Sequence, residues 1–154
     1  MAGYFFDSSA VVKNYVNEMG TTWVTRIADP MAGHRIHLAQ ITGVEVVSAL
    51  TRRAHSGSLS ARDAAIATGK FRHDFTNRYV AVDITIALIN SAMQLAEAYA
   101  LRGYDAVQLA AALDVNSYWH ALGMQPLTLV SADNDLNAAA AAEGLAVDDP
   151  NAHP

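Results

Sequence analysis

The chain of 154 residues contains no cysteine, which excludes a disulfide framework and any metal site built from thiolates. Proline is scarce, with four residues, and no Pro-, Gly- or Ser-rich linker divides the chain. The longest apolar segment, 84–101, is interrupted by Asn90, Gln94 and Glu97, so it does not reach the length of a membrane span. No basic segment precedes an apolar run at the N-terminus. We therefore expect a cytoplasmic protein without a signal peptide and without membrane association.

Basic residues are missing from the last third of the chain. All ten Lys and Arg lie within residues 1–102, together with eight acids, whereas residues 103–154 hold seven acids and neither Lys nor Arg. The two parts carry formal charges of +2 and −7, which gives the total of −5. This asymmetry indicates an acidic centre beside a basic surface that suits an anionic partner; the alternative is a helical surface that is merely acidic.

Short apolar runs alternate with helical patterns along the chain. We expect strands at Tyr4–Phe6, Ile36–Ala39, Val80–Val82, Leu127–Val130 and Leu145–Val147. We expect helices over Ala10–Asn17, Thr22–Ile27, Val44–His55, Ala61–Asn77, Ile84–Ala100, Ala106–Leu122 and Leu136–Glu143. The alternation predicts one α/β domain over residues 1–148, with a mostly parallel central sheet of about five short strands flanked by helices, and a frayed tail at 149–154.

Two of the acids that follow expected strands are candidates for a common site. In "GYFFDSSAVVK", Asp7 ends the first strand, and in "VSADNDL", Asp133 follows the fourth strand by two residues. The carboxyl ends of parallel strands meet at one edge of the sheet, which is where sites form in open α/β proteins. We therefore expect Asp7 and Asp133 to lie near each other.

Two further acids stand at expected helix starts. Glu45, in "TGVEVVSAL", fits a capping box with Thr42, but its apolar neighbours indicate that it is buried and has a polar partner. Asp105, in "GYDAVQLAAAL", opens a helix that is apolar almost all round and therefore belongs to the core; capping that helix is its alternative role. Together with Asp7 and Asp133, these acids would repel one another unless a cation bound among them, and carboxylate oxygens select hard ions such as Mg²⁺ or Mn²⁺.

Other candidate motifs are weaker. His34 and His37, in "HRIH", have no third ligand close in sequence, and we expect them to lie at the surface. The chain contains no Walker A sequence, no G-x-G-x-x-G, no H-E-x-x-H and no G-x-S-x-G.

The motifs around these acids resemble the PIN-domain family of metal-dependent nucleases and, within it, the VapC-type toxins of type II toxin–antitoxin pairs. The resemblance extends over about residues 4–148. It rests on the order, spacing and context of "YFFDSSAVVKNYVNEMG", "GVEVVSALTRR", "AYALRGYDAVQLAAAL" and "LVSADNDLNAAAAAEGLAV".

The resemblance implies a PIN-like fold with a site for one or two Mg²⁺ ions, or Mn²⁺ as a substitute. Four positions match the catalytic and metal-binding acids of the family: Asp7, Glu45, Asp105 and Asp133. Asp135 is an additional candidate ligand, and Ser9 and Ser131 match hydroxyl residues that support the first and the last acid.

The implied activity is that of a toxin endoribonuclease, in which metal-activated water hydrolyses RNA phosphodiester bonds. The cations that we expect to contact phosphates are Arg52, Arg53, Lys70, Arg72 and Arg78, although each could simply lie on a solvated helix face. Two other functions stay open: a non-catalytic PIN-like binding module and a small-molecule phosphohydrolase.

The resemblance also implies partners. We expect a cognate antitoxin and a homodimer whose paired sites face a common groove for RNA. An antitoxin Arg or Lys could enter the acidic site. An amphipathic antitoxin helix could bind an apolar groove lined by Val11, Val12, Tyr15, Trp23, Val47 and Leu50; the alternative is that these residues simply belong to the core.

Overall fold

The computed structural model describes residues 1–154. Its strands are β1 (Gly3–Phe6), β2 (Arg35–Ala39), β3 (Val80–Val82), β4 (Thr128–Val130) and β5 (Ala146–Asp148). Its α-helices are α1 (Ser8–Lys13), α2 (Thr21–Ala28), α3 (Thr42–Ser56), α4 (Ala61–Asn77), α5 (Ile86–Tyr99), α6 (Gly103–Ala121) and α7 (Asn134–Ala142). Two 3-10 helices complete the structure: η1 (Pro30–Ala32) and η2 (Pro150–Ala152). All five expected strands are present, each with ends within one residue of the expected ones.

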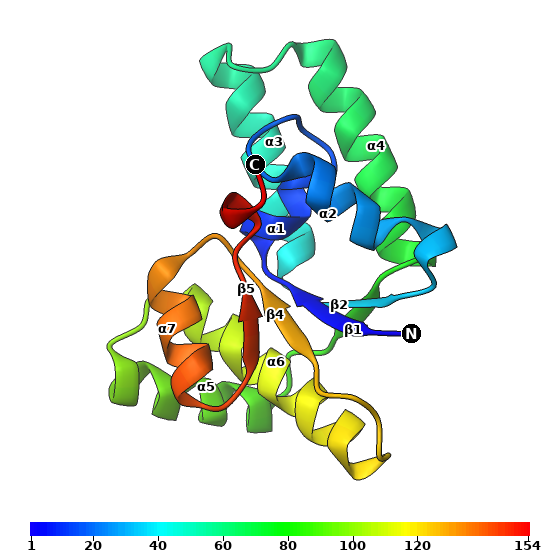
Figure 1. The fold of residues 1–154 in the computed structure, drawn as a ribbon. Helices are drawn as coiled ribbons and strands as arrows, with labels where there is room; N and C mark the ends of the chain where they lie inside the picture. Colours follow the sequence, from blue (N-terminus) through cyan, green and yellow to red (C-terminus); the bar gives the residue numbers. More distant parts are fainter.

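The strands form one sheet in the order β3-β2-β1-β4-β5, and all neighbours are parallel (Figure 1). The central strand, β1, pairs with both β2 and β4, and Phe6 at its end lies opposite Val130. The residues that follow these two, Asp7 and Ser131, therefore leave the sheet side by side at its carboxyl edge. The sheet order thus produces the proximity that the strand ends predicted.

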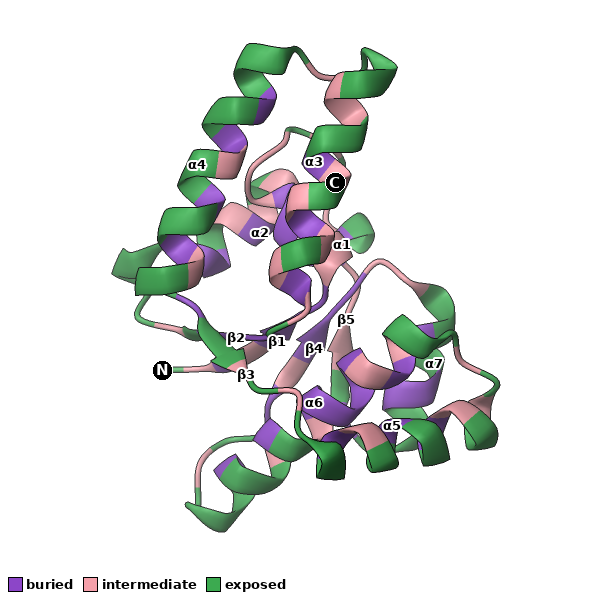
Figure 2. Ribbon diagram, turned by 180° about the vertical axis from the view of Figure 1, so that it is seen from behind, coloured by how far each residue is buried: buried purple, intermediate pink, exposed green.

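Helices cover both faces of the sheet. Alternation along β1 directs Phe5 into a core with α5, α6 and α7, and Phe6 into a second core with α1, α2, α3 and α4. Figure 2 shows buried residues along the central strands β1, β2 and β4 and on the helix sides that face them. Helix α6 contributes more buried residues than any other helix, Leu109 and Ala111 among them, which confirms the core position predicted from its apolar sequence. None of the helices combines the length and apolar character that a membrane span requires.

Two helices near the candidate site differ from expectation. Helix α1 ends at Lys13 instead of Asn17, because the buried Lys13 ammonium donates hydrogen bonds to the Met19 carbonyl oxygen (2.9 Å) and to Glu18 Oε1 (3.1 Å) and so turns the chain. Helix α6 begins at Gly103, three residues earlier than expected, which places Asp105 within its first turn.

The prediction of a frayed C-terminal tail is wrong. The His153 ring stacks on Trp23 with a centroid distance of 4.2 Å and an interplanar angle of 5°, and its Nε2 lies 2.7 Å from Asp148 Oδ1. Pro150 is buried against Gly20, whose φ of +83° favours glycine. A Cβ added at Gly20 would lie 2.4 Å from the Pro150 carbonyl oxygen. These contacts hold the tail on α2.

Candidate functional site

Asp7 is the most enclosed of the expected acids, with 4% of its surface exposed. It is the N-cap of α1, and its Oδ1 accepts hydrogen bonds from the Ala10 backbone N–H (2.9 Å) and from Ser9 Oγ (2.6 Å). Its Oδ2 accepts a hydrogen bond from Ser131 Oγ (2.6 Å). Burial raises the pKa of Asp7, and the hydrogen bonds oppose that rise because they favour the carboxylate. The side chain is therefore held in one orientation.

Two serines connect the first expected acid to the last. Ser131, fully buried, donates to Asp7 and accepts a hydrogen bond from the Asp133 backbone N–H (3.0 Å) through the same Oγ. Ser9 Oγ accepts a hydrogen bond from the backbone N–H of Ala132 (2.9 Å). Asp133 itself caps α7, and its side chain is partly exposed. Ser9 and Ser131 therefore hold the turn after β4 against Asp7.

Glu45 lies in the first turn of α3 and contacts two other elements. Its Oε2 accepts a hydrogen bond from Ser8 Oγ (2.9 Å), and its Oε1 accepts one from Gln108 Nε2 (3.1 Å). The capping-box interpretation is wrong, because α3 begins at Thr42 and its N-cap, Ile41, is not capped by a side chain. Glu45 is half-buried and has the polar partners expected for it: partial burial raises its pKa, and the hydrogen bonds from Ser8 and Gln108 partly offset this.

Sequence reasoning missed Gln108. Its side chain is 2% exposed, and its Nε2 also donates to Thr42 Oγ1 (2.8 Å), so one amide joins α6 to the start of α3. Its position in the sequence could have indicated this role, because Gln108 follows Asp105 by three residues and lies on the same face of an otherwise apolar helix. Gln108 thus orients Glu45 from the helix that carries Asp105.

Asp105 differs from Asp7 and Glu45 because no hydrogen bond contributes to its pKa shift. Burial, followed by the charges of Asp133 and Asp7, raises the pKa of Asp105 to about 6, and the nearby charge of Arg102 partly lowers it. Arg102 is the N-cap position of α6 and makes no side-chain capping bond. Asp105 therefore belongs electrostatically to the group formed by the other acids.

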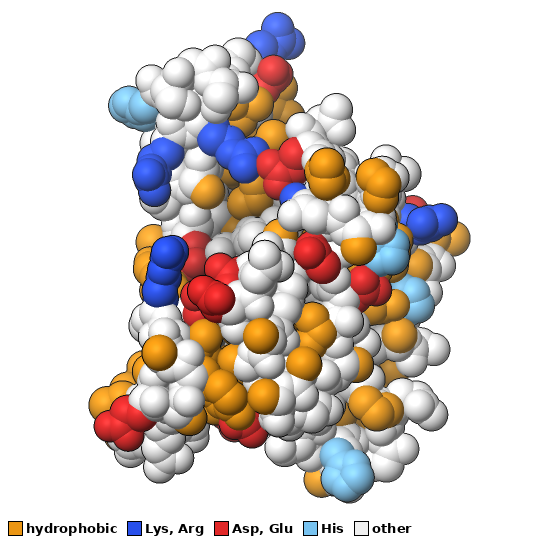
Figure 3. Space-filling model, turned by 60° about the vertical axis from the view of Figure 1, so that its left-hand side comes forward, with side chains coloured by type: hydrophobic (Ala, Val, Ile, Leu, Met, Phe, Trp, Pro, Cys, Tyr) orange, Lys and Arg blue, Asp and Glu red, His pale blue; other side chains and the backbone are white.

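These four residues are called the acidic centre below: Asp7, Glu45, Asp105 and Asp133. Repulsion among these charges contributes to the raised pKa of Asp7, Glu45 and Asp105, and the exposed Asp135 adds to the shift at Asp105. The ion pairs of the protein involve none of them. Figure 3 shows acidic side chains gathered on one face, with Lys and Arg side chains beside them.

The donor set of the acidic centre fits a hard divalent cation, because it consists of carboxylate oxygens whose repulsion a cation would relieve. The side chains do not yet converge on one point: no group of three or more Asp, Glu or His side chains is placed to hold a metal ion. Convergence on one ion therefore requires side-chain rotation, for which Asp105 is the least restrained acid.

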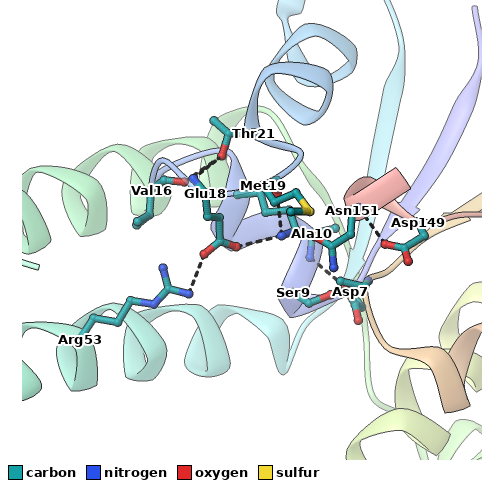
Figure 4. A network of polar contacts seen from close by, with 12 residues as sticks. Asp7, Ser9, Ala10, Val16, Glu18, Met19, Thr21, Arg53, Asp149 and Asn151 are labelled. Atoms are coloured by element: carbon teal, nitrogen blue, oxygen red, sulfur yellow. Dashed lines mark hydrogen bonds and ion pairs between the residues drawn. The ribbon is translucent and has the colours of Figure 1, made fainter. Parts of the chain in front are cut away.

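A groove of about 420 Å³ begins at Ser8, Ser9 and Glu45 and extends along α3 to Arg52 and Arg53; we call it the α3 groove. The Arg53 guanidinium is paired with Glu18 (2.9 Å), which also binds Lys13 (3.1 Å) (Figure 4). Arg52 is exposed and takes part in none of the ion pairs. Arg52 is therefore the unpaired cation of this groove.

The other expected phosphate contacts lie away from the α3 groove. Lys70 and Arg78 line a separate hollow on α4, and Arg72 lines an apolar hollow between α3 and α4. Arg78 is also occupied within the protein, since it donates to Asp74 Oδ1 (3.2 Å) and to the Ala28 carbonyl oxygen. Among the five expected cations, Arg52 and Arg53 alone line a groove with a member of the acidic centre, Glu45.

His37 is not at the surface, contrary to expectation. It lies on β2 with 5% of its surface exposed, and its ring meets Trp119 edge to face at a centroid distance of 5.5 Å. Neither ring nitrogen has a hydrogen-bond partner. Burial, together with the charge of Arg35, lowers the pKa of His37 to about 4. His37 therefore belongs to the core as a neutral side chain.

The apolar groove predicted for an antitoxin helix is largely core. Val11, Val12 and Leu50 are buried in the cluster around Phe6, and the Trp23 ring is covered by His153. These side chains are not available as one open surface.

The wholly parallel sheet, flanked by helices on both faces, is an α/β fold of the PIN-like type. Among solved structures, VapC20 from Mycobacterium tuberculosis, a toxin that cleaves the sarcin–ricin loop, is 16% identical with a TM-score of 0.62, over 99% of this chain and 100% of that one. PAE2754 from Pyrobaculum aerophilum is 18% identical with a TM-score of 0.62, over 98% and 85% of the two chains. VapBC2 from Rickettsia felis, bound to a DNA fragment from its promoter, is 13% identical with a TM-score of 0.62, over 95% and 97%.

No protein-family profile matches the chain, and no curated protein matches its sequence. The likeness to the solved structures, at these identities, shows the fold: the protein has the PIN-like α/β fold of the VapC toxins, as the sequence predicted.

Proposed function

We propose that the protein is a Mg²⁺-dependent endoribonuclease and the toxin of a toxin–antitoxin pair. The observation that carries this proposal is the acidic centre, in which four carboxylates from four segments have no paired basic side chain and their repulsion contributes to the raised pKa of Asp7, Glu45 and Asp105. The fold shared with the toxin VapC20 supports it. The four acids would hold one or two Mg²⁺ ions, or Mn²⁺, with Asp135 at the edge of the site.

The chain's own residues prepare this site for phosphodiester hydrolysis. When bound, the metal supplies a water of lowered pKa and neutralises charge at the phosphate. Ser9 and Ser131 orient Asp7, and Ser8 orients Glu45 together with Gln108, so these carboxylates are preorganised as acceptors. Asp105, with a pKa of about 6, loses its proton fully when a cation binds beside it.

The same acids suit inhibition by an antitoxin. An antitoxin Arg inserted into the acidic centre would pair with two carboxylate oxygens at once, replace the charge of the metal and block the α3 groove. We further propose a homodimer in which two such sites face one RNA-binding groove. Growth arrest on expression, relieved by co-expression of the product of a neighbouring small gene, is the expected cellular behaviour.

The test compares cleavage of cellular RNA by the wild-type protein, Asp105→Asn and Asp114→Asn, with mapping of the new 5′ ends. Asp114 is an exposed acid on the same helix, nine residues away, and so serves as the matched control. We expect Mg²⁺-dependent cleavage by the wild type and by Asp114→Asn, and none by Asp105→Asn or after addition of EDTA. Normal cleavage by Asp105→Asn, or full activity in EDTA, would exclude this mechanism.

A further inference from the structure

Tyr104 is an exposed aromatic residue next to the acidic centre. It lies in the first turn of α6, directly before Asp105, and 55% of its surface is exposed. It lines the α3 groove together with Glu45, Val44 and Arg52. The aromatic contacts of the protein do not include it. The core therefore leaves the Tyr104 ring available to a ligand in this groove.

The groove places two kinds of binding group at different distances from the acids. Arg52 follows Glu45 by seven residues, so both lie on one face of α3, two helical turns or about 10 Å apart. Tyr104, on α6, lies next to Asp105 in sequence. The groove thus offers an aromatic ring beside the acids and a free guanidinium farther along, while its other guanidinium, that of Arg53, is paired with Glu18.

This order of groups matches a single strand of nucleic acid. An unpaired nucleotide presents a flat base, which stacks on exposed aromatic rings, and a phosphate, which binds Arg. A base inside a duplex is already stacked on its neighbours and cannot cover a tyrosine ring in this way. A peptide does not present a flat base and a phosphate side by side, which makes it the less complementary occupant of a groove that offers an aromatic ring and a guanidinium.

We propose that Tyr104 stacks on an unpaired nucleobase next to the phosphate held at the acidic centre, and that Arg52 contacts a neighbouring phosphate of the same strand. This inference rests on the proposed function and adds to it the residue that recognises the substrate. Tyr104 then determines how tightly an unpaired strand binds, and the acids determine whether it is cut.

The experiment measures binding apart from cleavage. In an Asp133→Asn background, which keeps a capping side chain on α7 but removes one acid, we would measure the binding of fluorescent single-stranded oligoadenylate, single-stranded oligouridylate and their duplex, in Mg²⁺. Tyr104→Ala, Tyr104→Phe, Arg52→Ala and Tyr118→Ala would be compared. Tyr118 is the matched control, since it is an exposed tyrosine near the other end of α6.

We expect Tyr104→Ala to raise the Kd for single strands about 5- to 100-fold, more for adenylate than for uridylate, because purines stack more strongly. Tyr104→Phe keeps the ring and should bind like the parent, as should Tyr118→Ala. Arg52→Ala should weaken both strands equally and reduce the dependence of binding on salt. Binding of the duplex should not respond to Tyr104→Ala.

Three results would overturn the inference. In the first, Tyr104→Ala binds single strands as Tyr118→Ala does, while the wild-type protein cleaves RNA in Mg²⁺; the proposed function then survives. In the second, the wild-type protein neither binds nor cleaves RNA, and both proposals fail. In the third, Tyr104→Ala weakens binding of a co-expressed partner protein and leaves RNA binding unchanged, so that the groove is a protein-docking surface.

Discussion

Replacement of the buried His37 by leucine should make the protein less sensitive to acid. The imidazole lies between the sheet and Trp119, and both of its nitrogens lack a partner, so its protonation would place an unpaired charge in the core. Leucine has a similar size and cannot take up a proton. The substitution therefore isolates the contribution of one titrating group.

The size of the effect follows from the pKa of His37, which burial lowers from 6.5 to about 4. As the pH falls below 6.5, the unfolded chain takes up a proton at this position and the folded protein does not. The stability that the neutral histidine contributes is therefore complete above pH 6.5 and is lost as the pH falls to about 4. The full loss is about 3 kcal/mol in the free energy of unfolding.

Urea unfolding at a series of pH values tests this expectation. The difference in unfolding free energy between His37→Leu and the wild type should grow by about 3 kcal/mol in favour of the variant between pH 7 and pH 4. His55→Gln, at an exposed histidine on α3, serves as the control and should leave the pH dependence unchanged. A difference that is constant across this range would refute the burial of a neutral His37.

Three further predictions each concern a single residue. Gln108→Ala removes a donor from Glu45; it should destabilise the protein by about 2 kcal/mol in urea unfolding and slow RNA cleavage, because Ser8 alone then orients Glu45. Gly3→Ala places a Cβ 2.1 Å from the Trp119 ring and should lower the unfolding free energy by about 3 kcal/mol; an unchanged melting temperature would contradict this packing. Without metal, lowering the pH from 7 to 5 protonates Asp105, whose folded pKa of about 6 exceeds the ordinary 3.8, and so relieves repulsion. After solvent screening this should add about 1 kcal/mol of stability, a gain that thermal melts of Asp105→Asn should lack.

The sequence predicted the parts of the site that depend on strand ends. Apolar runs located β1 and β4, and because parallel strands share a carboxyl edge, the amino-acid sequence alone was enough to place Asp7 and Asp133 near each other. The roles of Ser9 and Ser131 came from the family resemblance, and the structure places both within hydrogen-bond distance of Asp7 or its neighbours.

Contacts between distant helices could not be predicted in this way. Gln108 reaches Thr42 and Glu45 across more than sixty residues of sequence, a contact that depends on how α6 crosses α3 and not on any local period. His37 and the C-terminal tail were misplaced for a related reason. The sequence predicts exposure for a polar residue on a short strand, such as His37, and for a polar tail with two prolines. The packing of Trp119 against His37 and of Trp23 against the tail is visible only in the structure.

Titration of the metal-free protein with Mn²⁺, followed by calorimetry, tests the acidic centre most directly. The wild-type protein and Asp114→Asn should bind one or two ions per chain, with Mg²⁺ competing for the same site. Asp105→Asn should lose at least one of these ions or bind it far more weakly, although its fold is intact by circular dichroism. Equal binding by Asp105→Asn and Asp114→Asn, or no binding by the wild-type protein, would contradict a metal centre built from these carboxylates.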